Sequence, residues 1–359
     1  MFTPTSLTRR RFLAAAGGAV DLAVASATSG GRVRAETQRL PNVIYTPPGT
    51  EQWAGDLTIP PAPHRDTLIV LIHGGGGTMG DKRSMTKWAE RYALAGYPTF
   101  NINYYLFDET TPAPIYPHPE RNVKAAVQYV RRNAAQFAVD PERILAHGGS
   151  AGARLSAELH VTGNDPYFAD PLLWPDTPDH TNGLIGFYGP YDSGQTSATQ
   201  YYGGPRNSPD PAVRDRSARA NSTARAATAR GPATLSQGDS DDLVPVSAAI
   251  NFADALIAAG KDATLTIVPG AEHGFDHDGL SQLSPEGERA AQSIVAWLDS
   301  RFPWPRTVLT LPTTRIPAPL LIGGGILPLP IQRASAPPPA TDAGTPTPIA
   351  MPMPAPRPR

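Results

Sequence analysis

The sequence contains no cysteine. This absence excludes disulfide bonds, thiolate metal sites, a cysteine nucleophile and the lipidated cysteine of a bacterial lipoprotein. The formal net charge is only -1 and no long run of one sign occurs, so the composition favours neither nucleic acid nor an anionic membrane surface as a partner. No internal repeat of fixed period is visible, which disfavours a solenoid or a propeller. The chain must therefore be stabilised by an ordinary packed core.

The N-terminal end differs in composition from the middle of the chain. Residues 9–13 (RRRFL) precede a mild apolar stretch rich in alanine and glycine, and this pattern resembles a twin-arginine export signal. The stretch is too short and too mild for stable membrane insertion. Residues 1–35 are therefore predicted to be a signal peptide, cleaved after Ala35 or Ala27, and the protein to be periplasmic or extracellular. A basic leader without an export role is the alternative.

The C-terminal end is rich in proline. Residues 303–359 keep neither a helical nor a strand period, and such a composition cannot bury enough apolar surface to offset the loss of chain entropy. This segment is predicted to be a disordered tail. The intervening residues 36–302 are predicted to form one catalytic domain.

The middle of the chain alternates short apolar runs with longer helical patterns. Residues 67–72 (TLIVLI) are apolar or β-branched throughout, as expected of a strand buried on both faces. The alternation predicts an α/β fold with a mainly parallel central sheet and helices on both faces. Further strands are predicted at residues 99–104, 143–146, 184–188, 233–236 and 264–268, and helices at residues 82–94, from 119, after 150, at 247–259 and at 285–302.

A candidate nucleophile follows the third predicted strand. Gly148-Gly149-Ser150-Ala151-Gly152 places a Gly-x-Ser-x-Gly pattern at a strand-to-helix turn, and this context makes a weak pattern specific. At such a turn the serine is held in strained backbone geometry, while glycines two residues away on either side avoid collisions with neighbouring chain. The turn exposes the Ser150 hydroxyl at a helix N-terminus, where partial positive charge favours a developing anion.

A run of glycines, from Gly74 to Gly77, follows His73 at the end of the first predicted parallel strand. Open α/β sheets bind ligands at this edge. Acyl transfer passes through an oxyanion, and each preorganised N–H donor contributes about 3 to 4 kcal/mol to its stabilisation. Gly75, Gly76 and Ala151 are therefore predicted to form the oxyanion hole. A flexible loop or a phosphate cradle is the alternative, but neither nucleotide-binding glycine pattern is present.

Serine needs a base whose pKa lies near neutrality, which indicates histidine. His273 lies in a loop directly after the last predicted strand, so it can reach the sheet edge that carries Ser150. His277 is the nearest competitor. The histidines at positions 73, 147, 160 and 180 are interpreted as structural or pocket-lining residues.

The acid that orients the base is expected between the serine and the histidine. The loop after the strand at residues 233–236 offers Asp239, Asp241 and Asp242. Asp241 is preferred because it lies three residues after Gly238 and three before Val244, a spacing that turns its carboxylate toward the histidine loop. Asp239 or Asp242 is the alternative partner. If neither is the partner, both are interpreted as solvated loop carboxylates.

With these residues placed, the sequence resembles the α/β-hydrolase superfamily, and within it bacterial esterases related to hormone-sensitive lipase and feruloyl-esterase-like carboxylesterases. The resemblance covers residues of about 42 to 302. Gln237 departs from it, since histidine often precedes Gly238. The specific pieces are His73 to Gly77, Tyr116-Pro117, Asp140 to Ile144, Gly149 to Gly152 and Ala271 to Phe275.

The resemblance implies an exported carboxylic-ester hydrolase acting on small or carbohydrate-linked acyl esters through an acyl-enzyme, with neither a metal ion nor an organic cofactor. Two irregular stretches, Gly163 to Asn182 and Asp192 to Gly231, are expected to form the rim of an open site. Trp174, Tyr201 and Tyr202 are candidate wall residues, with packing as the equal alternative. A peptidase or amidase of the same fold, and a non-catalytic surface-binding protein, are the competing functions.

Overall fold

The computed structural model describes residues 36–108, 110–192, 198–278 and 282–304. The predicted export signal lies outside these ranges, as does the predicted tail except for its first two residues. Both therefore stay predictions, and so do the domain boundaries that depend on them.

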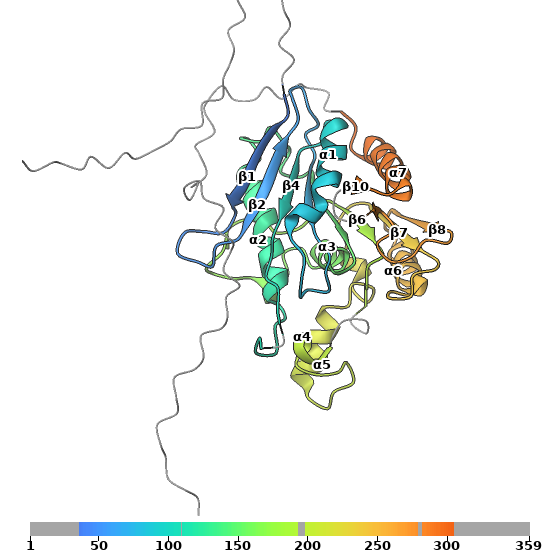
Figure 1. The fold of residues 1–359 in the computed structure, drawn as a ribbon. Coiled ribbons are helices and arrows are strands. Elements are labelled where there is room, and N and C mark those ends of the chain that lie inside the picture. The colour runs from blue at the N-terminus through green and yellow to red at the C-terminus, as the bar shows by residue number, and fades with distance from the viewer. Residues whose placement is uncertain (1–35, 109, 193–197, 279–281, 305–359) are drawn as a thin grey trace, which may run out of the picture. The chain divides into compact units, whose positions relative to one another are not determined.

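An eight-stranded sheet forms the centre of the described structure (Figure 1), with strand order β1-β2-β4-β3-β5-β6-β7-β8. The six strands from β4 to β8 in this order are parallel, whereas β1 and β2 form an antiparallel hairpin beside β4. The predicted mainly parallel sheet is confirmed. The strands are β1 (Gln38–Ile44), β2 (Ala54–Ile59), β3 (Leu68–Ile72), β4 (Thr99–Ile102), β5 (Ile144–Gly149), β6 (Gly183–Phe187), β7 (Ala233–Gly238) and β8 (Ala263–Val268).

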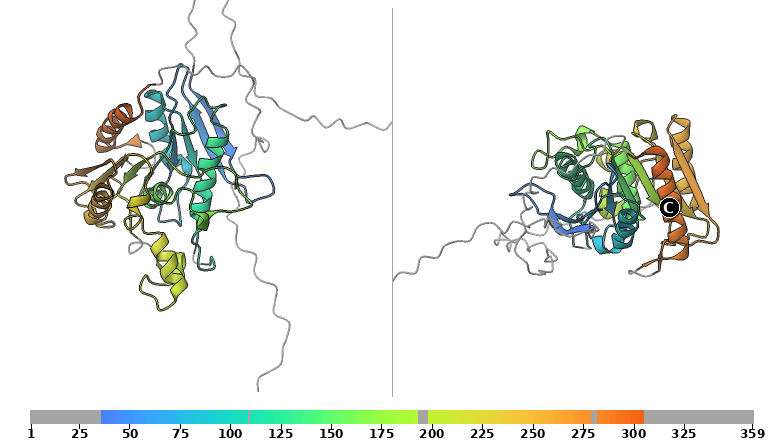
Figure 2. Two further views of the ribbon diagram at one scale, coloured as in Figure 1. Left: turned by 180° about the vertical axis from the view of Figure 1, so that it is seen from behind. Right: turned by 90° about the horizontal axis from the view of Figure 1, so that it is seen from above.

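Helices cover both faces of the sheet (Figure 2), also as predicted. Side chains of β3 explain the layers, because Leu68, Val70 and Ile72 pack with α2 and α3, whereas Ile69 and Leu71 pack with α1 and α7. The long helices are α1 (Thr86–Leu94), α2 (His118–Arg132), α3 (Ala151–Val161), α6 (Val246–Ala258) and α7 (Pro285–Arg301).

Shorter elements decorate this frame. The connection from β6 to β7 carries α4, α5 and η4, and the small β9–β10 pair precedes α7. The short elements are η1 (Lys82–Met85), η2 (Pro166–Phe168), α4 (Ala198–Tyr202), α5 (Pro211–Arg219), η4 (Ala226–Thr228), β9 (His277–Asp278) and β10 (Gln282–Leu283).

The sequence patterns did not predict the hairpin of β1 and β2. Its first strand (QRLPNVI) has a single buried residue and contains Pro41, and its pairing register shifts between Leu40 and Val43. Proline is tolerated there because an edge strand leaves N–H groups unused by the ladder. A bulged edge strand of this kind lacks the regular two-residue alternation by which a strand is recognised.

A buried ionic cluster joins α2, α3 and the inserted helix α4. The Arg154 guanidinium lies 2.9 Å from Glu120 Oε1 and 2.5 Å from Glu158 Oε1, and its Nη2 donates to the Tyr201 hydroxyl at 2.5 Å. All four side chains are buried. Burial raises the pKa of Glu158 well above its usual value, and the Arg154 charge opposes that rise.

Removal of this cation tests how strongly the cluster supports the fold. Arg154→Ala leaves buried carboxylates without a counter-ion and should lower the free energy of unfolding by about 3 to 5 kcal/mol. The Arg154 charge lowers the pKa of Glu158, so its removal raises this pKa further in the folded state and disfavours folding most where the unfolded carboxyl is ionised. The loss should therefore be larger at pH 8 than at pH 5, as measured by denaturant unfolding at both values.

The matched control is Arg289→Ala, which removes an exposed arginine paired with Glu286 within α7. Exposed pairs contribute little to stability, so this variant should unfold at the same denaturant concentration as the wild-type protein. Equal unfolding curves for Arg154→Ala and Arg289→Ala at pH 8 would contradict a structural role for the buried cluster.

Candidate active site

Ser150 lies on the turn between β5 and α3. Its backbone angles are φ 55° and ψ -122°, a conformation that costs a non-glycine residue about 1 to 3 kcal/mol. The turn is fixed on both sides, because the Ser150 N–H donates to the Phe187 carbonyl at 2.9 Å and its own carbonyl accepts from the Arg154 N–H at 3.1 Å. The strain is thus maintained by the neighbouring strand β6 and by the first turn of α3.

The two glycines that flank this turn have no room for a side chain. A Cβ atom on Gly148 would lie 2.3 Å from the Gly152 backbone carbon, and one on Gly152 would lie 2.1 Å from the Ile72 carbonyl oxygen. Gly152 allows α3 to approach β3 this closely, and Gly148 allows β5 to approach the start of α3. The spacing of the Gly-x-Ser-x-Gly pattern is therefore a steric requirement of the turn.

The structure brings Ser150, His273 and Asp241 together from three separate loops. His273 follows β8, and its Nε2 lies 2.9 Å from Ser150 Oγ. Its Nδ1 lies 2.8 Å from Asp241 Oδ2 in the loop after β7. The Asp241 side chain is fully buried, and 18% of the His273 side chain is exposed. A hydroxyl, an imidazole and a carboxylate thus form one continuous chain of hydrogen bonds.

Asp241 is held by more groups than the imidazole. Its Oδ1 accepts from the N–H groups of Leu243 at 3.0 Å and Val244 at 2.8 Å. Its Oδ2 also accepts from Gln237 Nε2 at 2.9 Å. Sequence reasoning noted Gln237 only as a departure from the related esterases and missed this contact. The amide thus binds the same carboxylate oxygen as the imidazole, whereas the loop N–H groups bind the other oxygen.

The competing acids and the competing base face elsewhere. Asp239 accepts from the Gly270 N–H at 2.6 Å and is exposed, and Asp242 is exposed as well. His277 directs its Nε2 toward Asp276 Oδ2 at 3.2 Å. Of the alternatives that the sequence left open, none reaches Ser150 or His273 in the hydrogen bonds of the described residues.

Two further histidines, at the ends of β3 and β5, are buried. Tyr92 shares a hydrogen bond of 2.9 Å with His147 Nδ1, and burial lowers the pKa of His147 to about 3. The His73 ring stacks on Tyr104 with centroids 4.5 Å apart, and burial also lowers its pKa. Both histidines are packed side chains, in agreement with the interpretation from sequence.

The glycine loop after β3 lies against the nucleophile turn. A Cβ atom on Gly74 would lie 2.9 Å from the Gly149 carbonyl oxygen and 3.3 Å from Ser150 Cβ. The Gly75 carbonyl accepts from the N–H groups of Thr78 and Met79, both at 3.1 Å, which closes the loop. Within the described residues, the N–H groups of Gly75, Gly76 and Ala151 donate to no other residue. Their role as an oxyanion hole stays a prediction.

Gly75 and Gly76 also show why this loop is glycine. Their φ angles are +113° and +66°, and a Cβ atom on Gly75 would lie 2.1 Å from the Met79 carbonyl oxygen. Other residues rarely adopt such angles. The backbone conformation of the loop therefore depends on these two positions.

The three candidate wall residues of the expected rim are held by packing. Tyr201 and Tyr202 of α4 are buried in a cluster with Phe107, Tyr116 and Phe168. Trp174 Nε1 donates to the Tyr45 carbonyl at 2.9 Å. All three are packing residues.

The stretch at 163–182 leads from the end of α3 to the start of β6. The first residue of β6 pairs with Leu145 near the start of β5, whereas Ser150 follows the end of β5. The stretch therefore begins and ends at the sheet edge opposite Ser150. Between these ends, Phe168 packs in one cluster with Phe107, which lies against Gly77 of the glycine loop, so the rim at 163–182 stays a prediction.

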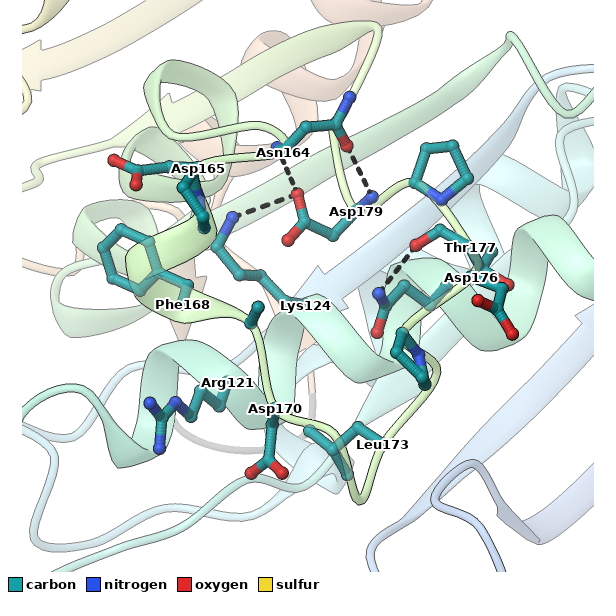
Figure 3. A pocket seen from close by; sticks show the side chains of 15 residues that line it. Arg121, Lys124, Asn164, Asp165, Phe168, Asp170, Leu173, Asp176, Thr177 and Asp179 are labelled. Atoms are coloured by element: carbon teal, nitrogen blue, oxygen red, sulfur yellow. Dashed lines mark hydrogen bonds and ion pairs between the residues drawn. The ribbon is translucent and has the colours of Figure 1, made fainter.

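A pocket of about 390 Å³ lies on the outer side of α2, beneath residues 164–179 (Figure 3). Its polar groups bind one another: Lys124 Nζ lies 3.2 Å from Asp179 Oδ1, and Asn164 and Asp179 exchange two hydrogen bonds. Burial lowers the pKa of Lys124. Neither Ser150 nor His273 lines this pocket, and its internal pairing indicates a packed junction between α2 and the loop.

Comparison with known proteins places this architecture among the α/β-hydrolases. The family model BD-FAE matches residues 56–256, which is more than half of the chain. The chain belongs to this BD-FAE family.

Relatives and solved structures carry esterase names. The probable carboxylic ester hydrolase LipM of Mycobacterium tuberculosis is 28% identical over 242 residues, covering 64% of this chain and 52% of LipM. The chain thus spans about half the length of this curated relative. A truncated carbohydrate esterase from gut microbiota superposes with a TM-score of 0.60 at 21% identity, covering 76% of this chain and 99% of the other. The butyrate-bound esterase Est2 of Thermogutta terrifontis gives 0.62 at 22%, covering 76% and 96%.

Proposed function

We propose that this protein is an exported serine carboxylic-ester hydrolase that acts on small or carbohydrate-linked acyl esters. The hydrogen-bond chain from Ser150 through His273 to Asp241, beside free glycine N–H groups, carries the proposal. Membership of the BD-FAE family and the esterase names of the relatives support the same reaction class. The name of one structural neighbour, a carbohydrate esterase, supports the carbohydrate-linked part of the substrate range.

The proposed reaction proceeds through an acyl-enzyme. His273 Nε2 takes the proton of the Ser150 hydroxyl while Oγ attacks the acyl carbon, and Asp241 stabilises the resulting imidazolium through Nδ1–H. The carbonyl oxygen becomes an oxyanion that accepts from Gly75, Gly76 and Ala151. The carbonyl then re-forms, the bond between the acyl carbon and the alcohol oxygen breaks, and His273 gives its proton to the leaving alcohol. A water molecule, activated by the same imidazole, hydrolyses the acyl-enzyme and regenerates Ser150.

Within the described residues, no helix combines the length and the apolar character that crossing a bilayer requires. The export part of the proposal rests instead on the twin-arginine pattern at residues 9–13. The proposed substrate is a small molecule or an ester-linked carbohydrate.

A fluorophosphonate probe tests the reaction class. Because Ser150 is the proposed nucleophile, the wild-type protein should be labelled at this residue and should hydrolyse short-chain p-nitrophenyl esters faster than peptide amides. Ser150→Ala should lose both labelling and turnover while unfolding like wild type. The measurements are mass spectrometry of the labelled peptide and initial rates on both substrate panels. Absence of labelling in folded protein would defeat the hydrolase proposal, and faster amide turnover would favour a peptidase.

A pair of substitutions separates the two nearest carboxylates. Asp241→Asn should lower kcat by about four orders of magnitude, because the amide no longer holds the imidazole in the required tautomer. Asp239→Asn is the matched control and should keep nearly all activity, since Asp239 binds only its own loop and Gly270. Initial rates on one p-nitrophenyl ester decide between them. The reverse order of effects would assign the acid to Asp239.

The export proposal has a separate test in the native host. Replacement of Arg9 and Arg10 by lysine keeps the positive charge but removes the arginine pair that the twin-arginine signal requires. Mature protein should then disappear from the exported fraction and accumulate inside the cell, as followed by immunoblotting. Replacement of Arg34 by lysine, outside the motif, is the control. Unchanged secretion of the double variant would reject a twin-arginine signal.

A further inference from the structure

A buried carboxylate lies three residues beyond the candidate base in the same loop. Asp276 is only 2% exposed. It accepts from the Tyr188 hydroxyl at 2.5 Å and from Trp88 Nε1 at 2.8 Å, and His277 Nε2 lies 3.2 Å away. Tyr188 follows β6 and Trp88 belongs to α1. Asp276 therefore fastens the loop of His273 to two elements that are distant in sequence.

Tyr188 contacts both the base and the nucleophile turn. Its ring meets the His273 imidazole edge to face, with centroids 4.8 Å apart and planes at 62°. A Cβ atom on Gly149 would lie 2.6 Å from the Tyr188 hydroxyl oxygen. The residue before Ser150 thus passes directly over this side chain. Tyr188 therefore contacts both the turn that carries Ser150 and the imidazole that meets it.

The backbone at Tyr188 also departs from ordinary geometry. Its φ angle is +39°, and its N–H donates to the Ser236 carbonyl of β7 at 2.8 Å. A bulky residue rarely holds a positive φ unless its surroundings enforce it. Here the enforcing contacts are the Asp276 carboxylate on the hydroxyl and β7 on the backbone. Their combined effect is to fix the ring against His273.

The bond between Asp241 and Nδ1 leaves one motion of the imidazole open. Once the bond between Nε2 and Ser150 Oγ is broken, the remaining hydrogen bond at Nδ1 permits the ring to rock about that contact, which moves Nε2 relative to Ser150 Oγ. A displacement of about 1 Å at a catalytic group can cost about 100-fold in rate. Contact with a fixed aromatic edge blocks this motion.

We propose that Tyr188 is a positioning residue for His273, and that Asp276 holds Tyr188 in place through its hydroxyl. The catalytic consequence rests on the proposed esterase function, whereas the positioning of the imidazole does not. Asp276 and Tyr188 take no part in the transfer of protons between Ser150, His273 and the substrate. They act only through the orientation of the base.

Two variants measure separately how the Tyr188 hydroxyl and the Tyr188 ring affect the reaction rate. Tyr188→Phe keeps the ring but removes its bond to Asp276, and Tyr188→Ala removes the ring as well. We expect kcat to fall about tenfold in the first and about 100-fold in the second, with KM within about twofold of wild type, because misorientation of the base affects the transition state more than substrate binding. A general loss of structure would instead lower the fraction of active protein, which titration with the fluorophosphonate probe measures.

An NMR signal reports the imidazole itself. The Nδ1–H proton of His273, hydrogen-bonded to a buried carboxylate, should give a far-downfield resonance that is absent from His273→Gln. This resonance should broaden in Tyr188→Phe and disappear in Tyr188→Ala through faster exchange with water.

The matched control is Tyr191→Phe. Tyr191 lies three residues further along, is buried against Phe252, and its hydroxyl bonds to no side chain among the described residues. Removal of this hydroxyl should leave both the resonance and kcat as in wild type.

The outcomes separate the two proposals. If the wild-type protein hydrolyses no ester but its downfield resonance still responds to the Tyr188 variants, the positioning role stands and the proposed function fails. If folded Tyr188→Phe and Tyr188→Ala both keep the resonance and the kcat of wild type, the positioning role is overturned. Should Tyr188→Ala fail to fold, Tyr188→Phe decides alone.

Discussion

The parallel arrangement of β3, β5, β7 and β8 is the constraint on which the candidate site depends. Parallel strands end at the same edge of a sheet, so the loops that follow these four strands meet although about 200 residues separate the first from the last. Each loop supplies one component: the glycine N–H groups, the hydroxyl, the carboxylate and the imidazole. Hydrogen bonds of 2.8 and 2.9 Å then join three of these components.

Buried polar groups on both sides of Ser150 reinforce this meeting of loops. On one side Arg154 joins α2, α3 and α4, and on the other Asp276 joins the base loop to α1 and to the segment after β6. Such groups are costly to bury unless each finds a partner. Their geometry therefore limits how α3 and the His273 loop can shift, which preserves the distance between hydroxyl and imidazole.

The strain at Ser150 and Tyr188 belongs to the same arrangement. Both residues have positive φ angles, and both are held by main-chain bonds to the next strand of the sheet, Ser150 to Phe187 and Tyr188 to Ser236. Rigid strands thus hold two unfavourable conformations next to each other. These enforcing contacts keep the nucleophile and the proposed positioning ring preorganised.

The sequence by itself determined the parallel sheet, the order of its elements and the glycine spacing of the turns, because apolar periodicity and turn chemistry are local properties. It also indicated Ser150 and His273 as partners. Only the tertiary structure decided that Asp241 rather than Asp239 faces His273, that Gln237 supports it, and that Tyr188 lies against the imidazole. Such contacts join residues far apart in the chain and leave no local pattern, since the direction of a loop side chain depends on what packs against it.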